Sequence, residues 1–290
     1  MRLKSKITGF ISGFLAMPAF AESGLEIIGQ PVADGIGFQP AATKLARDLQ
    51  WLDGMVLIII TAITVFVLGL LAYVILRYNR KANPVPETFT HNSSVEVAWT
   101  VIPIVILVFI GAFSLPVLFD QQKIPEGEVN IKVTGYQWYW GYEYVDEGFE
   151  FESFLIGEGK VLTPEVELEL QEAGYTRDQF LLATDAAVVV PVDKTVVMQI
   201  TGADVIHSWT IPAFGVKQDA VPGRLGQLWF KAEKEGIYFG QCSELCGKDH
   251  AYMPITVKVV SQDAYKSWLS AAKSEYAGAT QPYNIAEASE

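Results

Sequence analysis

Two long apolar runs most constrain the fold of this chain. They extend over residues 55–76 and 97–119, and neither contains an Asp, Glu, Lys or Arg. A helix needs about 20 apolar residues to cross the ~30 Å hydrocarbon core of a bilayer, and both runs reach that length. The sequence therefore predicts a transmembrane hairpin over 51–122, with helices at about 54–77 and 97–119.

The first residues have the pattern of a secretory signal. Arg2, Lys4 and Lys6 precede an apolar stretch that ends in Ala-Phe-Ala at 19–21, which is the small-x-small pattern of a cleavage site. We expect a signal peptide at 1–21, a periplasmic N-terminal segment at 22–50, and a multi-pass protein of the cell inner (plasma) membrane. Both ends of the mature chain would then lie on the periplasmic side.

The charge of the chain points to the kind of partner it has. Removing residues 1–21 takes away three basic residues and lowers the formal charge from −12 to −15. Such a balance argues against nucleic acid as a partner and favours a basic protein.

The pattern changes at about residue 123 to short runs that alternate apolar and polar side chains, rich in Val, Ile, Tyr and Trp. Such runs are typical of an all-β sandwich or barrel, which we expect over 123–276. An acidic, helix-like insertion interrupts them at 156–182, and an amphipathic helix at 262–273 follows a plausible N-cap, Ser261. We expect a flexible tail at 277–290. The predicted strands include 129–133, 195–200, 228–230, 237–239 and 255–259.

One short segment carries most of the metal-binding side chains. Cys242, Cys246, His250 and Met253 lie close together in sequence, and a second imidazole, His207, stands upstream beside a predicted strand. Because exported proteins do not readily keep free thiols, we expect the two cysteines to be bridged or bound to a metal.

The donor types restrict the metal. Two imidazoles, one thiolate and a weak methionine form the mononuclear blue-copper set, so a second thiolate is one ligand too many. Two thiolates can instead bridge two copper ions, each capped by one histidine, in a centre suited to electron transfer. A structural zinc site and a disulfide between Cys242 and Cys246 remain as alternatives, although neither explains the presence of Met253.

Three runs resemble cytochrome c oxidase subunit II, particularly bacterial relatives of the mitochondrial enzyme. They are YQWYWGYEY at 136–144, DVIHSWTIPAFGVKQDAVPGR at 204–224 and GQCSELCGKDHAYMP at 240–254. The resemblance implies a cupredoxin-like barrel behind the helix hairpin and a binuclear copper centre (CuA). The implied copper ligands are His207, Cys242, Cys246, His250, Met253 and the carbonyl of Glu244.

The resemblance also implies roles around that centre. The Glu244 carboxylate would help to hold a magnesium ion shared with subunit I, and Trp138 would accept electrons from cytochrome c. Glu96 would be an entrance for protons into subunit I; its other reading is a helix-start carboxylate favoured by the helix dipole. Cytochrome c would dock on carboxylates matching Glu143, Asp185 and Asp204, whereas 146–152 does not align with the family pattern.

The implied function is that of an oxidase subunit that passes electrons from cytochrome c to the haem-copper subunit I. That partner reduces oxygen to water and pumps protons. Haem belongs to the partner, because copper takes two of the three histidines and leaves only His91. Subunit III and membrane lipid are the other expected partners. The alternative is a membrane-anchored copper chaperone or thiol-disulfide protein, which would place its cysteines early in a thioredoxin-like domain.

Overall fold

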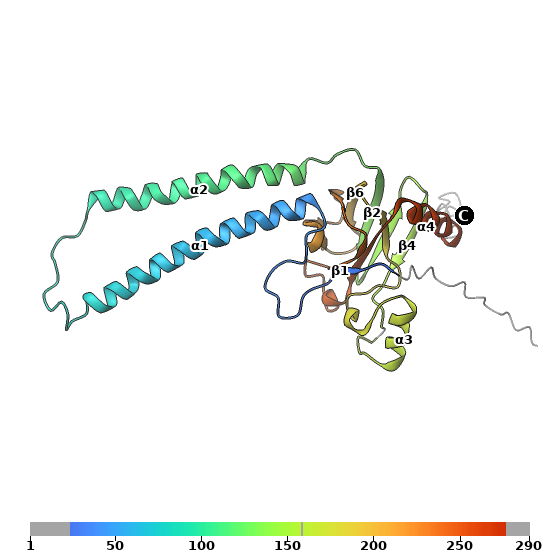
Figure 1. Ribbon diagram of the computed structural model, residues 1–290, viewed down its shortest axis with the longest axis horizontal. Coiled ribbons are helices and arrows are strands. Elements are labelled where there is room, and N and C mark those ends of the chain that lie inside the picture. Colours follow the sequence, from blue (N-terminus) through green and yellow to red (C-terminus); the bar gives the residue numbers. More distant parts are fainter. Residues whose placement is uncertain (1–23, 158, 277–290) are drawn as a thin grey trace, which may run out of the picture.

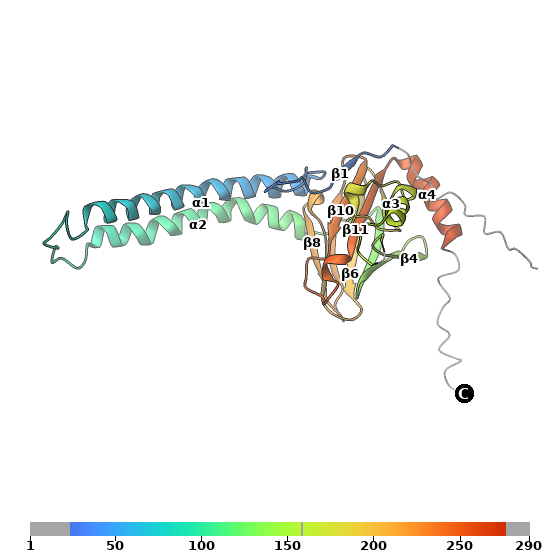
Figure 2. The ribbon, with the colours of Figure 1, turned by 90° about the horizontal axis from the view of Figure 1, so that it is seen from below.

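The computed structural model describes residues 24–157 and 159–276, and it consists of a helical arm joined to a β-rich domain (Figures 1 and 2). Helices α1 (Lys44–Arg77) and α2 (Ser93–Gln122) extend from the same side of the domain, and the connection between them lies at the far end of the arm. The expected signal peptide at 1–21 and tail at 277–290 fall outside the described residues.

The arm has the properties predicted for a membrane-spanning hairpin. Both helices are long and apolar enough to cross a membrane, and none of the most apolar stretch of either helix is buried within the chain. The two helices contact each other through side chains such as Trp51 and Phe113, whose ring centroids lie 5.8 Å apart. The remaining apolar side chains point outward, as expected for helices whose solvent is lipid or other subunits.

The predicted start of the first helix near residue 54 is wrong, because α1 begins at Lys44. Thr43 caps this helix: its hydroxyl accepts a hydrogen bond from the Ala46 amide at 2.9 Å and donates one to the Phe214 carbonyl at 2.7 Å. Leu45 and Ala46 are buried against the β domain. The polar residues before the apolar run are therefore helical through a tertiary contact that hydropathy does not detect.

The second helix is also longer than the predicted span of 97–119. It begins at Ser93, where the Asn92 side chain accepts a hydrogen bond from the Val95 amide at 3.3 Å, and it continues to Gln122. Its last turn is fastened to the β domain, since the Trp229 indole donates a hydrogen bond to the Asp120 carbonyl at 3.1 Å.

The β domain contains three sheets, and every predicted strand lies within an observed one. The first sheet has the order β1 (Ile27–Gly29), β10 (Gly236–Gln241), β11 (Pro254–Val260), β5 (Val188–Pro191). The second has the order β4 (Phe149–Ser153), β3 (Tyr139–Tyr144), β2 (Val129–Tyr136), β6 (Thr195–Gly202), β9 (Gly226–Lys231). The third is the pair β7 (His207–Ile211) and β8 (Val216–Ala220).

One hydrophobic core joins these sheets. Alternate residues of β2 are buried, as its apolar-polar alternation predicts. The large side chains of Trp140 from β3, Trp209 from β7 and Tyr238 from β10 are all fully buried in the same cluster. The core thus fixes β7 and β10, the strands that lead to the metal-binding side chains, against the second sheet.

The β domain also contains the two helices that the sequence predicts, one in the acidic insertion and one near the C-terminus. The acidic insertion contains α3 (Pro164–Glu172) and forms a small core of its own against β10. Helix α4 (Gln262–Glu275) begins at the expected cap, since the Ser261 hydroxyl accepts a hydrogen bond from the Ala264 amide at 3.2 Å. The short 3-10 helices are η1 (Arg177–Gln179), η2 (Pro212–Phe214) and η3 (His250–Tyr252).

Candidate metal centre

The metal-binding loop is closed at its base by two paired strands. Strands β10 and β11 are antiparallel, and their last pair is Gln241 with Pro254, so the whole of 242–253 forms the connection between them. The Cys242 amide also donates a long hydrogen bond to the Met253 carbonyl, at 3.4 Å. The first and last metal-binding side chains of the loop are therefore neighbours in space.

The upstream histidine reaches the loop through strand β7. His207 is the first residue of that strand, and the Ser243 amide donates a hydrogen bond to the Ser208 carbonyl at 2.9 Å. This contact ties the loop to β7 directly beside His207. The fold therefore brings together side chains that are separated by more than thirty positions in the sequence.

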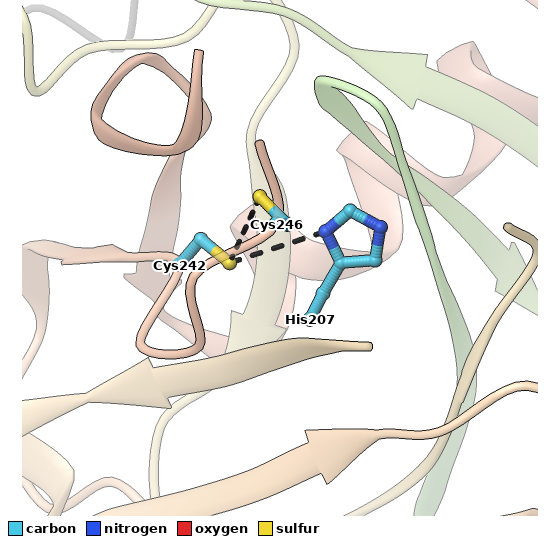
Figure 3. Close-up of side chains that lie close together, drawn as sticks. All are labelled: His207, Cys242 and Cys246. Carbon is cyan, nitrogen blue, oxygen red and sulfur yellow. Dashed lines mark hydrogen bonds between the residues drawn. The ribbon is translucent and has the colours of Figure 1, made fainter. Parts of the chain in front are cut away.

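The donor atoms converge as the sequence predicts (Figure 3). The ligand atoms of His207, Cys242 and Cys246 all lie within 4.8 Å of one another. The two sulfurs are 3.9 Å apart, and the Cys242 Sγ lies 4.0 Å from the His207 Nδ1. The Cys246 Sγ lies 3.6 Å from the Nδ1 of His250. Each sulfur therefore has one imidazole beside it.

Each sulfur also has one weaker donor at hand. The Sδ of Met253 lies 3.5 Å from the Cys246 Sγ, and the carbonyl oxygen of Glu244 lies 3.3 Å from the Cys242 Sγ. Two equivalent half-sites result, each with a sulfur, an imidazole nitrogen and one further donor. The six donors predicted from the sequence are thus all present in one cluster.

These distances decide between the possible uses of the cysteines. A disulfide has its sulfurs about 2.0 Å apart, so sulfurs at 3.9 Å belong to free thiols. A structural zinc ion would take four donors in a tetrahedron and would leave the Met253 thioether and the Glu244 carbonyl unused. Soft sulfur donors in two half-sites fit copper better.

The ionisation of the thiols also favours a bound cation. Burial raises the pKa of both thiols, but hydrogen bonding with His207 and with nearby backbone groups lowers the pKa of Cys242 to about 7. Burial and then the charge of Cys242 raise the pKa of Cys246 to about 12. Two adjacent thiolates therefore require positive charge between them, which metal ions supply.

A carboxylate orients the His207 ring. Its Nε2 lies 2.8 Å from the Asp204 Oδ1, so Nε2 carries the proton shared with Asp204 and Nδ1 faces the sulfur. Partial burial raises the pKa of Asp204, but hydrogen bonds from His207 and from the amides of Val205 and Gln137 outweigh it and lower the pKa overall. Sequence reasoning assigned Asp204 only to docking and missed this role, although its spacing of three residues from His207 could have indicated it.

The aromatic run on β2 and β3 divides into core and site residues. Trp140 is fully buried, as expected for packing, and its indole donates a hydrogen bond to the Met253 carbonyl at 3.3 Å. Trp138 is partly exposed, and its indole donates a hydrogen bond to the Cys246 carbonyl at 3.2 Å. Its ring also packs against Gly247, where an added Cβ would come within 3.0 Å of the indole. Trp138 thus contacts the loop directly.

The three expected docking acids have structural partners. Glu143 forms an ion pair with Lys132 at 2.8 Å. Asp185 is exposed, and its Oδ1 accepts hydrogen bonds from the amides of Phe154 at 2.7 Å and Ala186 at 2.6 Å. Asp204 accepts a hydrogen bond from the Gln137 amide at 2.8 Å, which places it next to Trp138.

The other two predicted carboxylates lie in different places. Glu244 has an exposed side chain, while its carbonyl faces Cys242. Glu96 lies in the first turn of α2, at the end of the arm farthest from the β domain, and accepts a hydrogen bond from the Asn92 amide at 3.1 Å. Glu96 thus stands where a carboxylate favours the helix dipole, and it is remote from the metal-binding loop.

Comparison with known proteins identifies the family. The family model for the periplasmic domain of cytochrome c oxidase subunit II matches residues 129–260, and the model for the transmembrane domain matches 31–117. The chain is 63% identical to cytochrome c oxidase subunit 2 of Cereibacter sphaeroides, over 94% of this chain and 93% of the relative. The chain belongs to the cytochrome c oxidase subunit II family.

Other members of the subunit II family are also similar to this chain. Cytochrome c oxidase subunit 2 of Arabidopsis thaliana is 40% identical to this chain, in an alignment over 81% of this chain and 88% of the relative. The crystal structure of the periplasmic domain of subunit II from Bradyrhizobium japonicum is 47% identical, with a TM-score of 0.44, and covers 53% of this chain and 99% of that structure.

The chain is thus a subunit of cytochrome c oxidase, a membrane protein with two spans and a periplasmic domain. Its cluster of histidine, cysteine and methionine side chains is consistent with a CuA site. The β-rich fold places the cysteines late in the chain, behind two spanning helices, and the alternative of a thioredoxin-like chaperone is set aside.

Proposed function

We propose that this chain is the electron inlet of the oxidase, with Trp138 as the receiving side chain and the loop at 242–253 as the relay toward subunit I. The observation that carries this proposal is the pair of buried sulfurs 3.9 Å apart, each beside one histidine Nδ1. The donors proposed to hold two copper ions are His207, Cys242, Glu244 (carbonyl), Cys246, His250 and Met253.

When bound, a copper pair held by these donors would supply one-electron transfer with little reorganisation. The chain's own contribution is a loop whose ends are held by β10 and β11 and whose Cys242, Cys246 and Met253 side chains are buried. Asp204 keeps the His207 Nδ1 free for a metal by sharing the proton on Nε2. These contacts keep the donors in place and exclude water from the sulfurs.

Docking of a basic cytochrome c is proposed on the acidic surface beside Trp138. Asp204 accepts a hydrogen bond from Gln137, the residue before Trp138. Glu143 lies on β3, in the same sheet as β6, the strand that precedes Asp204. Asp185 is proposed as a third member of this surface. Long-range attraction between opposite charges would speed the encounter and weaken as salt is added, since the Debye length falls to about 8 Å at 0.15 M ionic strength.

A magnesium ion at the contact with subunit I is proposed on the exposed Glu244 carboxylate. The Glu244 backbone already faces the copper site, so one residue would touch both metal sites. Oxygen donors such as carboxylates suit this hard cation, and subunit I would supply the others.

Glu96 is proposed as an entrance for protons. It is partly exposed in the first turn of α2, at the end of the arm opposite to the periplasmic domain, so it would lie at the inner side of the membrane. This placement assumes the predicted orientation in the inner membrane, with residues 22–50 and the domain at 123–276 outside. Subunit III and lipid would cover the outward surfaces of the hairpin.

Electron paramagnetic resonance of the purified, oxidised enzyme tests the copper assignment. We expect a signal split by two copper nuclei that share one unpaired electron. Cys246→Ser should abolish this pattern, whereas Ser243→Ala, an exposed change in the same loop, should keep it. A one-copper blue spectrum in the unaltered enzyme would contradict the proposal.

A further inference from the structure

A lysine of the acidic insertion reaches the turn that carries one of the proposed copper ligands. The Lys160 ammonium forms an ion pair with the Asp249 carboxylate and lies 4.2 Å from the centre of the Tyr252 ring. Asp249 directly precedes η3, whose first residue is His250 and whose last is Tyr252, and Met253 follows directly. The Lys160 side chain thus contacts the residues at both ends of this turn.

Among the described residues, the turn that begins at Asp249 is held by its own backbone and by Lys160. Its backbone is closed by hydrogen bonds from the Tyr252 amide to the Asp249 carbonyl, at 2.8 Å, and from the His250 amide to the Gly247 carbonyl, at 3.3 Å. An aspartate before a helical turn commonly caps it with its own side chain, but the Asp249 side chain makes no capping hydrogen bond here. The carboxylate is directed across to Lys160 instead.

Lys160 and Gly157 both contact other residues of the acidic insertion. The Lys160 amide donates a hydrogen bond to the Gly157 carbonyl at 3.1 Å, and Gly157 packs so closely on α3 that an added Cβ would lie 2.8 Å from Val166. Val166 belongs to a small hydrophobic cluster with Phe239 of β10. The insertion therefore rests on the strand that leads into the copper-binding loop.

We propose that Lys160 is a positioning residue for the copper centre. By holding Asp249 and Tyr252, it fixes the turn that directs His250 and Met253 toward Cys246. This inference rests on the proposed function, because it assigns a second layer of contacts to the same site. A single, partly exposed ion pair contributes little to the stability of a whole domain. The role of Lys160 is therefore local, on the geometry and retention of the copper ions.

Variants of the full chain in the purified oxidase test the role of Lys160. Lys160→Met removes the charge and keeps much of the length of the side chain, Lys160→Arg keeps the charge, and Asp249→Asn removes the partner charge. Lys194→Met is the matched control: Lys194 also pairs with an acid distant in sequence, Glu128 at 2.7 Å, but at the beginning of β6, whereas His207 follows its end.

Release of copper to a copper(I) chelator is the first measurement. Outer contacts of metal ligands are commonly worth 10- to 100-fold in affinity, so we expect roughly tenfold faster release from Lys160→Met and from Asp249→Asn. Lys160→Arg and Lys194→Met should release copper at the rate of the unaltered enzyme.

The reduction potential separates positioning from charge alone. Lys160→Met should lower the potential, because losing a positive charge favours the oxidised centre, and Asp249→Asn should raise it. The double variant Lys160→Met/Asp249→Asn should return to nearly the original potential while still releasing copper fast.

Three outcomes decide the question. The proposal is overturned if Lys160→Met and the double variant release copper at the rate of the unaltered enzyme, even if their reduction potentials shift. If Lys160→Met does not assemble, unchanged release from Asp249→Asn also overturns it. Absence of the two-copper signal from the unaltered enzyme contradicts the proposed function instead, and is thereby distinguished from failure of this inference.

Discussion

The Trp138 indole and the Cys246 carbonyl are joined by a hydrogen bond of 3.2 Å. This bond links a partly exposed aromatic ring to the backbone of a residue whose sulfur belongs to the metal-binding cluster. If Trp138 receives the electron as proposed, the path from the protein surface to the site contains few covalent bonds and one hydrogen bond.

Replacing Trp138 should slow electron uptake and leave the metal site intact. Trp138→Gln removes the aromatic ring, and we expect a lower rate of reduction by cytochrome c with an unchanged copper resonance signal. Stopped-flow oxidation of cytochrome c measures this rate. Tyr139→Phe, on the adjacent residue, is the control and should react normally. Equal rates for Trp138→Gln and the unaltered enzyme would remove Trp138 from the path.

Asp204 should matter for metal retention as well as for docking. Asp204→Asn weakens the contact that holds the His207 ring, so we expect roughly 10- to 100-fold lower copper affinity, as for other partners of metal-bound histidines. Glu143→Gln also removes one acidic charge, but its partner is Lys132. It should reduce only the salt-sensitive encounter with cytochrome c. Identical copper affinity in both variants would refute the separate role of Asp204.

Gly135 should tolerate no side chain, because the His207 ring lies against it. An added Cβ would come within 2.8 Å of the ring in Gly135→Ala, so we expect an altered copper resonance spectrum. Gly141→Ala is the comparison, since its Cβ would meet the far end of the Tyr136 ring at 3.1 Å, and that ring can move. Matching spectra for the two variants would mean that Gly135 does not set the position of His207.

The junction of arm and domain should depend on Gly215. Its φ of +68° and the approach of an added Cβ to 2.6 Å from the Ala46 Cα both oppose Gly215→Ala. Gly223→Ala, at φ +76° with open space around it, isolates the backbone cost of about 1 to 2 kcal/mol. Overpacking should add about 1 to 3 kcal/mol at Gly215. Thermal unfolding of the purified oxidase should therefore begin at a lower temperature for Gly215→Ala, and equal shifts would disprove tight packing there.

Features with a local pattern were predictable from the sequence. Uninterrupted apolar runs indicated the two helices, and alternation indicated strands such as β2 and β6, because these periods follow from backbone geometry. The spacing of Cys242, Cys246, His250 and Met253 indicated the loop, because one short connection holds all four.

Features that depend on long-range contacts were missed. The early start of α1 depends on Thr43 meeting Phe214, and the contact of Lys160 with Asp249 depends on how the insertion folds back on β10. The partner of His207 could have been found from its short spacing to Asp204, but an acidic residue in an acidic chain also suggests docking. The metal-donor side chains could be predicted from their chemistry, but the residues that contact them became known only from the fold.

Helix α1 begins in contact with the β domain and continues without a break into the arm, and this has a mechanical consequence. The helix is continuous from Lys44 to Arg77, and a bidentate pair between Arg47 and Glu233 fastens its first turns to the domain, with no flexible linker between them. The height and tilt of the sulfur pair above the bilayer are thus set by a stiff rod. Because tunnelling rates fall steeply with distance, such a mounting would keep the gap to the proposed acceptor in subunit I nearly constant through thermal motion.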